Sequence, residues 1–500
     1  MYGFGAYLVR KGRIVTLPSS APGRGAMFMD SRFRGNDDVA TAPPMKKTAL
    51  LLAAALLSFP ALAQNLNQVE RLRDAALKDE VAWDIVEGLT TEIGPRPAGT
   101  DSEARAREWA VRRLKALGFA NVHVETYDMP VWVRGEEKAE IVAPFPQKLV
   151  VTALGNSGAT PPGGVTAQVV GFDSLADLEA APEAAVRGKI VFVTHGMTAT
   201  QDGSQYGYYG GVRRTGPSVA SRKGAAGIVI RSIGTDYHRN PHTGVQIWGE
   251  GARPIPAGAL SLPDAEQLQR VLKRGKPVTM RLLLTPRNLG IRQSGNVVAE
   301  VRGTDPDAGI ILVGGHLDSW DLGTGAIDNA AGVAITAAAA KRIMAAGRPR
   351  RTIRVVWFGA EEVGGNGGDS YRAAHKQEKI VFVSESDFGA DRVWRMDPGL
   401  AEANSALADR IAAALYPLGI GRGTQAASGG ADLGDWVRAG VAAIDLQQDG
   451  SRYFDYHHTP DDTLDKVDPE QLRQNVAAWT AMLALVANAP EEISGKTPAP

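Results

Sequence analysis

The feature that most constrains the fold is a regular alternation of apolar runs and helical segments after residue 296. The run at 309–313 is apolar without a break, which is typical of a strand buried on both faces of a sheet. Strands are predicted at 309–313, 352–358, 379–383 and 441–446, and helices at 329–346, 366–376, 404–415 and 469–487. This alternation predicts an α/β fold with a mostly parallel central sheet flanked by helices.

The preceding residues divide into a helical segment and a β-rich segment. Helical spacing at 69–77, 81–89 and 102–117 is followed by an alternating run at 121–127. Between about 145 and 285, short apolar runs alternate with Gly-rich loops, and strands are predicted at 168–172, 189–193, 227–231 and 278–284. The predicted organisation is a main domain formed by 64–140 and 289–490, a β-rich insertion at 141–288 and a flexible tail at 491–500.

Residues 45–63 have the pattern of a secretory signal peptide. Two lysines follow Met45, an apolar run occupies 48–57, and Ala61-Leu62-Ala63 supplies small residues for cleavage. The apolar run is too short to span a bilayer, so we expect no stable membrane insertion after cleavage. Residues 1–44 would lie upstream of the true start, and we expect them to be disordered or not translated. These features predict a secreted, periplasmic protein.

Composition excludes several classes of function. The 55 Lys and Arg residues balance 55 Asp and Glu residues, so no basic excess supports binding to nucleic acid or to an anionic membrane. The chain has no cysteine, which excludes disulfides, thiolate zinc sites and cysteine nucleophiles. A transition metal would therefore have to be held by Asp, Glu and a few of the eight histidines.

Polar side chains follow each of the predicted strands of the central sheet. His316 and Asp318 come after the first strand, the pair Glu361-Glu362 after the second, and Asp387 after the third. The fourth strand leads into a segment that contains two adjacent histidines, and a further aspartate precedes the first helix; these residues are His457, His458 and Asp328. Because ligands bind beyond the carboxyl ends of strands in open α/β sheets, we expect the side chains to converge on one crevice.

So many carboxylates in one crevice predict bound cations. Acidic side chains at close range repel each other unless positive charge neutralises them. Two divalent ions that share one carboxylate would do so, and His and carboxylate ligands without sulfur favour Zn²⁺ over Mn²⁺ or Co²⁺. Two such ions about 3.5–4 Å apart can lower the pKa of a bridging water and polarise a carbonyl group.

The same residues resemble the motifs of a known enzyme family. The segments 316–321, 327–329, 360–362, 385–387 and 458–463 are similar, in this order, to those of the co-catalytic di-zinc exopeptidases. Within that family, which includes bacterial aminopeptidases, the chain most resembles the carboxypeptidase Q branch, and the resemblance covers about 66–487. In the insertion, the segments 188–193, 218–227 and 255–264 resemble a protease-associated domain, which that branch carries at this place.

The resemblance implies a set of metal ligands. Asp328 would bridge two zinc ions. His316 and Asp387 would complete one site, and Glu362 and His458 would complete the other. Members of this branch are homodimers by the same resemblance, so a homodimer is a possible assembly.

The resemblance also implies roles beside the metals. Glu361 would act as the general base that takes a proton from the bridging water and passes it to the leaving amine. Asp318 would accept the ring N–H of the neighbouring histidine ligand and fix its tautomer. Asp432, in the segment that begins at Ser428, has a position that lies near the substrate in the family, and His457 would line the substrate pocket.

Each feature alone has a simpler reading. Asp328 could be the N-cap of the helix that begins at Asn329, where the family often has a second aspartate. An isolated Glu-Glu pair is usually solvated, and His-His before Thr-Pro could be an ordinary turn. The remaining histidines are predicted to be structural or exposed; they are His123, His195, His238, His242 and His375.

Taken together, these observations predict a zinc-dependent exopeptidase that hydrolyses dipeptides or short peptides. An aminopeptidase that acts on longer peptides is one alternative, and an inactive peptidase-like binding protein is another of a different class. A glutaminyl cyclase, whose active site would resemble a single-zinc site, is a third alternative. The polarity of an exopeptidase depends on the groups that hold the substrate terminus, and the sequence does not show them.

Overall fold

The computed structural model describes residues 66–496, which contain two eight-stranded sheets. The predicted signal peptide and residues 1–44 lie outside this range. Within the range, no helix combines the length and the apolar character needed to cross a membrane.

The first sheet has the strand order β1-β10-β12-β11-β13-β16-β14-β15. Its four central strands are parallel: β12 (Thr352–Phe358), β11 (Ile310–His316), β13 (Ile380–Glu385) and β16 (Ala442–Gln448). Antiparallel neighbours flank them on both sides, so the sheet is mixed and the predicted parallel arrangement holds only for its centre. The flanking strands are β10 (Arg287–Val301), β1 (Ala120–Val133), β14 (Val393–Pro398) and β15 (Gly421–Arg422).

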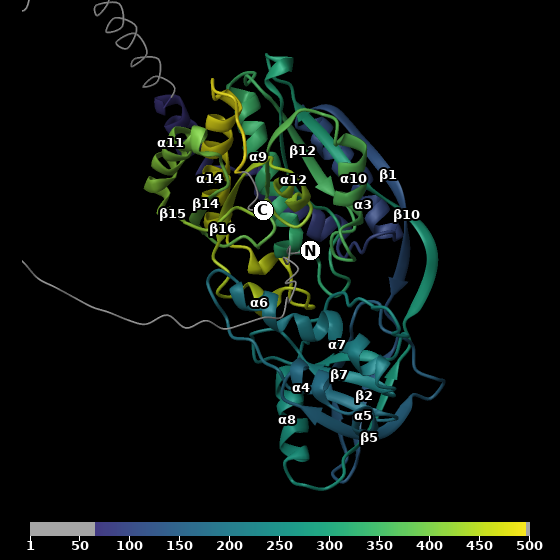
Figure 1. The fold of residues 1–500 in the computed structure, drawn as a ribbon. Coiled ribbons are helices and arrows are strands. Elements are labelled where there is room, and N and C mark those ends of the chain that lie inside the picture. Colours follow the sequence, from purple (N-terminus) through teal and green to yellow (C-terminus); the bar gives the residue numbers. More distant parts are fainter. Residues whose placement is uncertain (1–65, 497–500) are drawn as a thin grey trace, which may run out of the picture. The chain divides into compact units, whose positions relative to one another are not determined.

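Helices cover this sheet, as predicted (Figure 1). Helix α9 (Ala331–Ala346) packs on β11 and is buried over most of its length. Its many alanines let α14 (Pro469–Asn488) and α2 (Val81–Gly88) approach closely. The side chain of Leu312 in β11 belongs to an apolar cluster that also includes residues of α10 (Asn366–His375) and α12 (Gly434–Arg438). Other helices of this region are α3 (Asp101–Ala116), α11 (Ser405–Leu415) and α13 (Tyr453–Tyr456).

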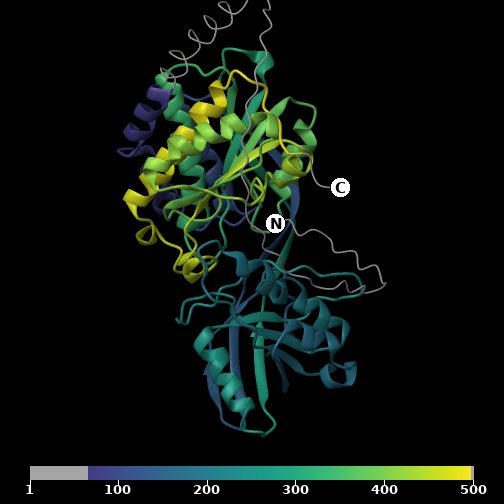
Figure 2. The ribbon, with the colours of Figure 1, turned by 60° about the vertical axis from the view of Figure 1, so that its left-hand side comes forward.

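The second sheet has the order β3-β2-β9-β5-β6-β7-β8-β4 and a core of its own. Its strands are β2 (Glu137–Ala143), β3 (Gln147–Leu149), β4 (Val151–Ala153), β5 (Val165–Phe172), β6 (Ile190–Val193), β7 (Gly227–Arg231), β8 (Ala257–Leu260) and β9 (Thr279–Leu284). Helix α8 (Leu262–Leu272) lies alongside the strands in both views (Figures 1 and 2) and contributes Leu268 to their core. The other helices here are α4 (Leu175–Ala180), α5 (Glu183–Val186), α6 (Ser204–Tyr209) and α7 (Gly211–Arg222).

Two chain passages join the sheets. Three residues separate the end of β1 at Val133 from the start of β2 at Glu137, and two residues separate the end of β9 at Leu284 from the start of β10 at Arg287. The predicted boundaries at 140/141 and 288/289 fall inside β2 and β10, so each lies a few residues inside a strand rather than in a linker.

Candidate metal centre and active site

The parallel centre of the first sheet gathers the predicted side chains at one edge. His316 is the last residue of β11, Glu361 and Glu362 lie in the turn after β12, and Asp387 lies two residues after β13. Asp328 lies in a short π-helical turn, Ala326–Ala330, just before α9. Because parallel strands end at the same edge, side chains that are distant in sequence meet there.

The carboxylate of Asp328 faces two different groups of side chains. Its Oδ1 is 3.0 Å from His316 Nε2, which in turn is 3.3 Å from an oxygen of Asp387. Its Oδ2 is 3.4 Å from His458 Nε2, which is 2.6 Å from Oε2 of Glu362. One carboxylate therefore lies between two sets of nitrogen and oxygen donors.

The backbone around Asp328 is held by other residues, which leaves its carboxylate to the cluster. The amides of Ala326, Ile327 and Asp328 donate to the carboxylate of Asp462, at 2.8, 2.8 and 3.2 Å. The side-chain oxygen of Asn329 accepts from the amide of Gly332 in the first turn of α9, at 2.9 Å. The reading of Asp328 as the N-cap of this helix is therefore wrong, because the neighbouring asparagine bonds to the first turn instead.

Burial makes the charges of this cluster costly without a cation. Asp328 is 3% exposed and Glu362 is 4% exposed. Burial raises the pKa of the Glu362 carboxyl to about 8, although the adjacent His458 imidazole acts in the opposite direction. Oε1 of Glu362 is buried and has no hydrogen-bond partner. An unpaired buried oxygen beside imidazole nitrogens fits a divalent cation, since such an ion would satisfy it.

Asp318 holds the turn that carries the two glutamates. Its carboxylate accepts the amide N–H groups of Glu361 and Glu362, at 3.2 and 3.4 Å. The ring nitrogen Nδ1 of His316 is 2.9 Å from the backbone oxygen of Asp318 and 3.5 Å from its carboxylate. The backbone carbonyl is therefore the nearer acceptor for His316, because the carboxylate is directed toward the amides of the turn.

Comparison with known proteins places the chain in a family. The family model described as "Peptidase family M28" matches residues 296–483. Carboxypeptidase Q from Bos taurus is 34% identical over 407 residues, which cover 81% of this chain and 84% of that protein. The chain belongs to peptidase family M28. The predicted resemblance is thereby confirmed, and this M28 peptidase is a metallopeptidase, a hydrolase.

Solved structures agree with the assignment. An M28 peptidase precursor from Shewanella amazonensis SB2B is 46% identical, with a TM-score of 0.84, over 88% of this chain and 99% of that one. A zinc aminopeptidase from Bacillus subtilis, 19% identical, has the same fold with a TM-score of 0.60, over 84% of this chain and 98% of that one.

The M28 peptidase has a further histidine at this centre that sequence reasoning did not select. His242, in the loop between β7 and β8, is 1% exposed, and its Nε2 is 2.8 Å from Nδ1 of His457. The backbone oxygen of the next residue, Thr243, is 3.2 Å from Nδ1 of His458. A Cβ at Gly244 would lie 2.7 Å from the same ring nitrogen, so this close approach requires glycine. No local pattern around His242 indicates this contact.

His457 was predicted to line the substrate pocket. In the structure it lies in the centre of the cluster. Its Nε2 is 3.1 Å from Oδ2 of Asp328, and its other nitrogen meets His242. The two adjacent rings, His457 and His458, are stacked with centroids 3.7 Å apart. Both histidines of the pair therefore reach the same carboxylate oxygen.

The remaining candidates are Asp432 and Ser428. Asp432 is 5% exposed; its Oδ1 accepts the amide of Gly368, and its own amide donates to Glu385. Burial, followed by the charge of Glu361, raises the pKa of Asp432 well above its ordinary value. Ser428 is exposed and its hydroxyl donates to Asp445.

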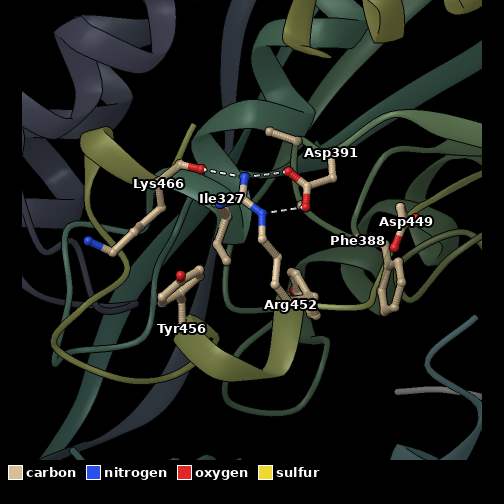
Figure 3. Close-up of a pocket in the computed structure, with 10 residues that line it drawn as sticks. Ile327, Phe388, Asp391, Asp449, Arg452, Tyr456 and Lys466 are labelled. Atoms are coloured by element: carbon tan, nitrogen blue, oxygen red, sulfur yellow. Dashed lines mark hydrogen bonds and ion pairs between the residues drawn. The ribbon is translucent and has the colours of Figure 1, made fainter. Parts of the chain in front are cut away.

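Two pockets lie next to the cluster, and their volumes differ. The pocket beside Ile327 holds only about 10 Å³. The guanidinium of Arg452 makes two bonds to Asp391 there and a third to the carbonyl of Lys466 (Figure 3). Such a space admits a water molecule at most. The cavity beside Glu362, by contrast, measures about 330 Å³.

Proposed function

We propose that this M28 peptidase is a zinc-dependent exopeptidase that hydrolyses dipeptides or short peptides. The observation that carries the proposal is the arrangement around Asp328, whose two oxygens face separate groups of donors. The names of the relatives support it, since carboxypeptidase Q and a Bacillus subtilis aminopeptidase are both exopeptidases by name.

The proposed ligands are those that the family resemblance implies, and the distances between them support the proposal. One zinc ion would be held by Asp328 with His316 and Asp387, whose N and O atoms are 3.3 Å apart. The second would be held by Asp328 with Glu362 and His458, at 2.6 Å. Imidazole nitrogen and carboxylate oxygen are donors that zinc accepts in the absence of sulfur. The structure of a zinc aminopeptidase with the same fold supports the choice of metal.

Two zinc ions would supply a water of lowered pKa and a polarised substrate carbonyl. Glu361 is the proposed general base: it takes the proton from the attacking water and passes it to the leaving amine. An oxygen of Glu361 lies within 4.8 Å of ligand atoms of His316 and Asp387, and its side chain is more exposed than that of Glu362. Asp318 would keep Glu361 in place through the amide of the turn.

The wider setting is also part of the proposal. The pattern at 45–63 supports export to the periplasm. The likeness of segments in 141–288 to a protease-associated domain supports that identity for the second sheet. Homodimerisation rests only on the resemblance to the carboxypeptidase Q branch. On the substrate side, His457 and Asp432 lie at the cluster, whereas the hydroxyl of Ser428 is bound to Asp445.

The test is hydrolysis of free and blocked dipeptides before and after metal removal. We expect 1,10-phenanthroline to abolish hydrolysis and Zn²⁺ to restore it, whereas the non-chelating isomer 1,7-phenanthroline has no effect. Hydrolysis by protein that elemental analysis shows to be free of metal would contradict the proposal.

The same panel separates the two polarities. An aminopeptidase, suggested by the 24% identity to aminopeptidase YwaD over 454 residues, would cleave C-amidated peptides and reject N-acetylated ones. A carboxypeptidase would do the reverse, and a dipeptidase would reject both.

A further inference from the structure

We propose that the 330 Å³ cavity beside Glu362 binds an uncharged apolar side chain of the peptide substrate. This inference rests on the proposed exopeptidase function and adds the substrate class. The cavity is large enough for the purpose, since a dry cavity of about 150 Å³ already holds a benzene ring.

The cavity lies directly beside the proposed metal centre. Glu362 is one of its lining residues, and Trp320 is another. The Trp320 ring stacks on the imidazole of His458, with centroids 5.0 Å apart and an angle of 18° between planes. A side chain bound in the cavity would therefore lie next to the site where its own backbone is cleaved.

The wall of the cavity is mostly apolar. Met129 and Val131 of β1 line it and belong to a small apolar cluster with Ala98 and Ala360. Further along the same strand, Trp132 and Val133 extend this wall, and Val363 adds to it from the turn after the two glutamates. When an apolar side chain packs against such a wall, binding becomes more favourable in proportion to the apolar area removed from water.

The arginine and the aspartate that line the cavity are already paired with each other. Among the described residues that line the cavity, Arg134 is the one with a positively charged side chain. Its guanidinium bonds to both oxygens of Asp321, at 2.8 and 2.9 Å, and also to Glu137 and the carbonyl of Ala153. With its donors used in this way, Arg134 has little left to offer a substrate carboxylate.

The region that contains the second sheet, 137–284, also contributes residues to the wall of the cavity. Val245 lies three residues after His242 and pairs with Gly155, and both residues line the cavity. The loop that touches the histidines therefore also sets the size of the cavity.

The first test compares dipeptides that differ at one side chain: Ala-Ala, Leu-Ala, Ala-Leu, Asp-Ala and Ala-Asp. We expect one of the two leucine peptides to exceed Ala-Ala in kcat/KM by about ten-fold or more, because a few methylene groups in an apolar pocket give that discrimination. The aspartate peptide with the same position substituted should fall below Ala-Ala.

The second test narrows or charges the cavity with two variants. Val245→Trp should lower the ratio of kcat/KM for the preferred leucine peptide to kcat/KM for Ala-Ala about ten-fold, and Val133→Asp should do the same. The matched control is Ile247→Trp, two residues along the same segment, where the native side chain is 51% exposed and does not line the cavity. If the ratio of kcat/KM for the leucine peptide to kcat/KM for Ala-Ala is the same in wild type, Val245→Trp and Val133→Asp, the inference is overturned.

Failure of the proposed function would look different. If wild type cleaves none of the dipeptides, the exopeptidase proposal fails. Calorimetric binding of Leu-Ala, Ala-Leu and Ala-Ala to wild type and Val245→Trp then still tests the cavity, with preferential binding of a leucine peptide to wild type expected and equal binding against it.

Discussion

Two regions of the molecule meet at the candidate centre and contribute different things. The edge of the first sheet supplies charged side chains that directly follow strands, such as His316 after β11 and Asp387 after β13. The second region supplies a loop, in which His242 contacts an imidazole, Thr243 offers a carbonyl, and Val245 lines the cavity. The difference indicates that the sheet places the reactive groups, while the loop orients them and shapes the space for the substrate.

The largest effect is expected for the proposed base in the first region. Glu361→Gln should lower kcat by about 10²–10⁴-fold, because the variant cannot accept a proton. Metal content, measured by elemental analysis, should stay at the wild-type value, since Glu361 is not a proposed ligand. The control is Glu402→Gln, an exposed glutamate of the same region. Near-normal kcat in Glu361→Gln would remove the base from the mechanism.

A smaller loss is expected when the turn that carries the base is loosened. Asp318→Ala removes the acceptor for the amides of Glu361 and Glu362, so activity should fall about 10–100-fold. If Asp318 acts through position alone, kcat should fall while KM for Ala-Ala changes little. An unchanged kcat would show that the turn holds its shape without this carboxylate.

The smallest of the three losses is expected in the second region. His242→Ala removes a neighbour of His457 but no proposed ligand, so kcat should fall about ten-fold, near the lower limit for such supporting residues. Bound zinc should remain at two ions per chain. His238→Ala is the control, because His238 contacts the backbone of Asp455 and not the histidine pair. A loss as large as that of Glu361→Gln would break the distinction between the two regions.

Elements with strong local patterns could be predicted from the sequence. Strand β12 has the predicted bounds 352–358, and β7 has the predicted bounds 227–231, because both are apolar runs that end at loop residues. Helix α9 begins at Ala331, not at 329, because Asp328 and Asn329 have non-helical backbone angles in the turn that presents the cluster.

Other features depend on contacts between distant residues. Strand β14 was not predicted, because its sequence from Val393 to Pro398 mixes apolar and charged residues without alternation. The same limit applies to His242, which reaches His457 across 215 positions of sequence. The carboxylates and histidines that follow the strands were recognisable because their spacing is local, whereas this loop contact arises only from tertiary packing.

The most direct test of the central claim is a crystal structure of the zinc-loaded protein with anomalous scattering measured at the zinc edge. The account predicts two peaks on opposite oxygens of Asp328, at about 2.0–2.2 Å. One should also contact His316 and Asp387, and the other Glu362 and His458. A single peak, or a peak held by His242 and His457 in their place, would contradict it.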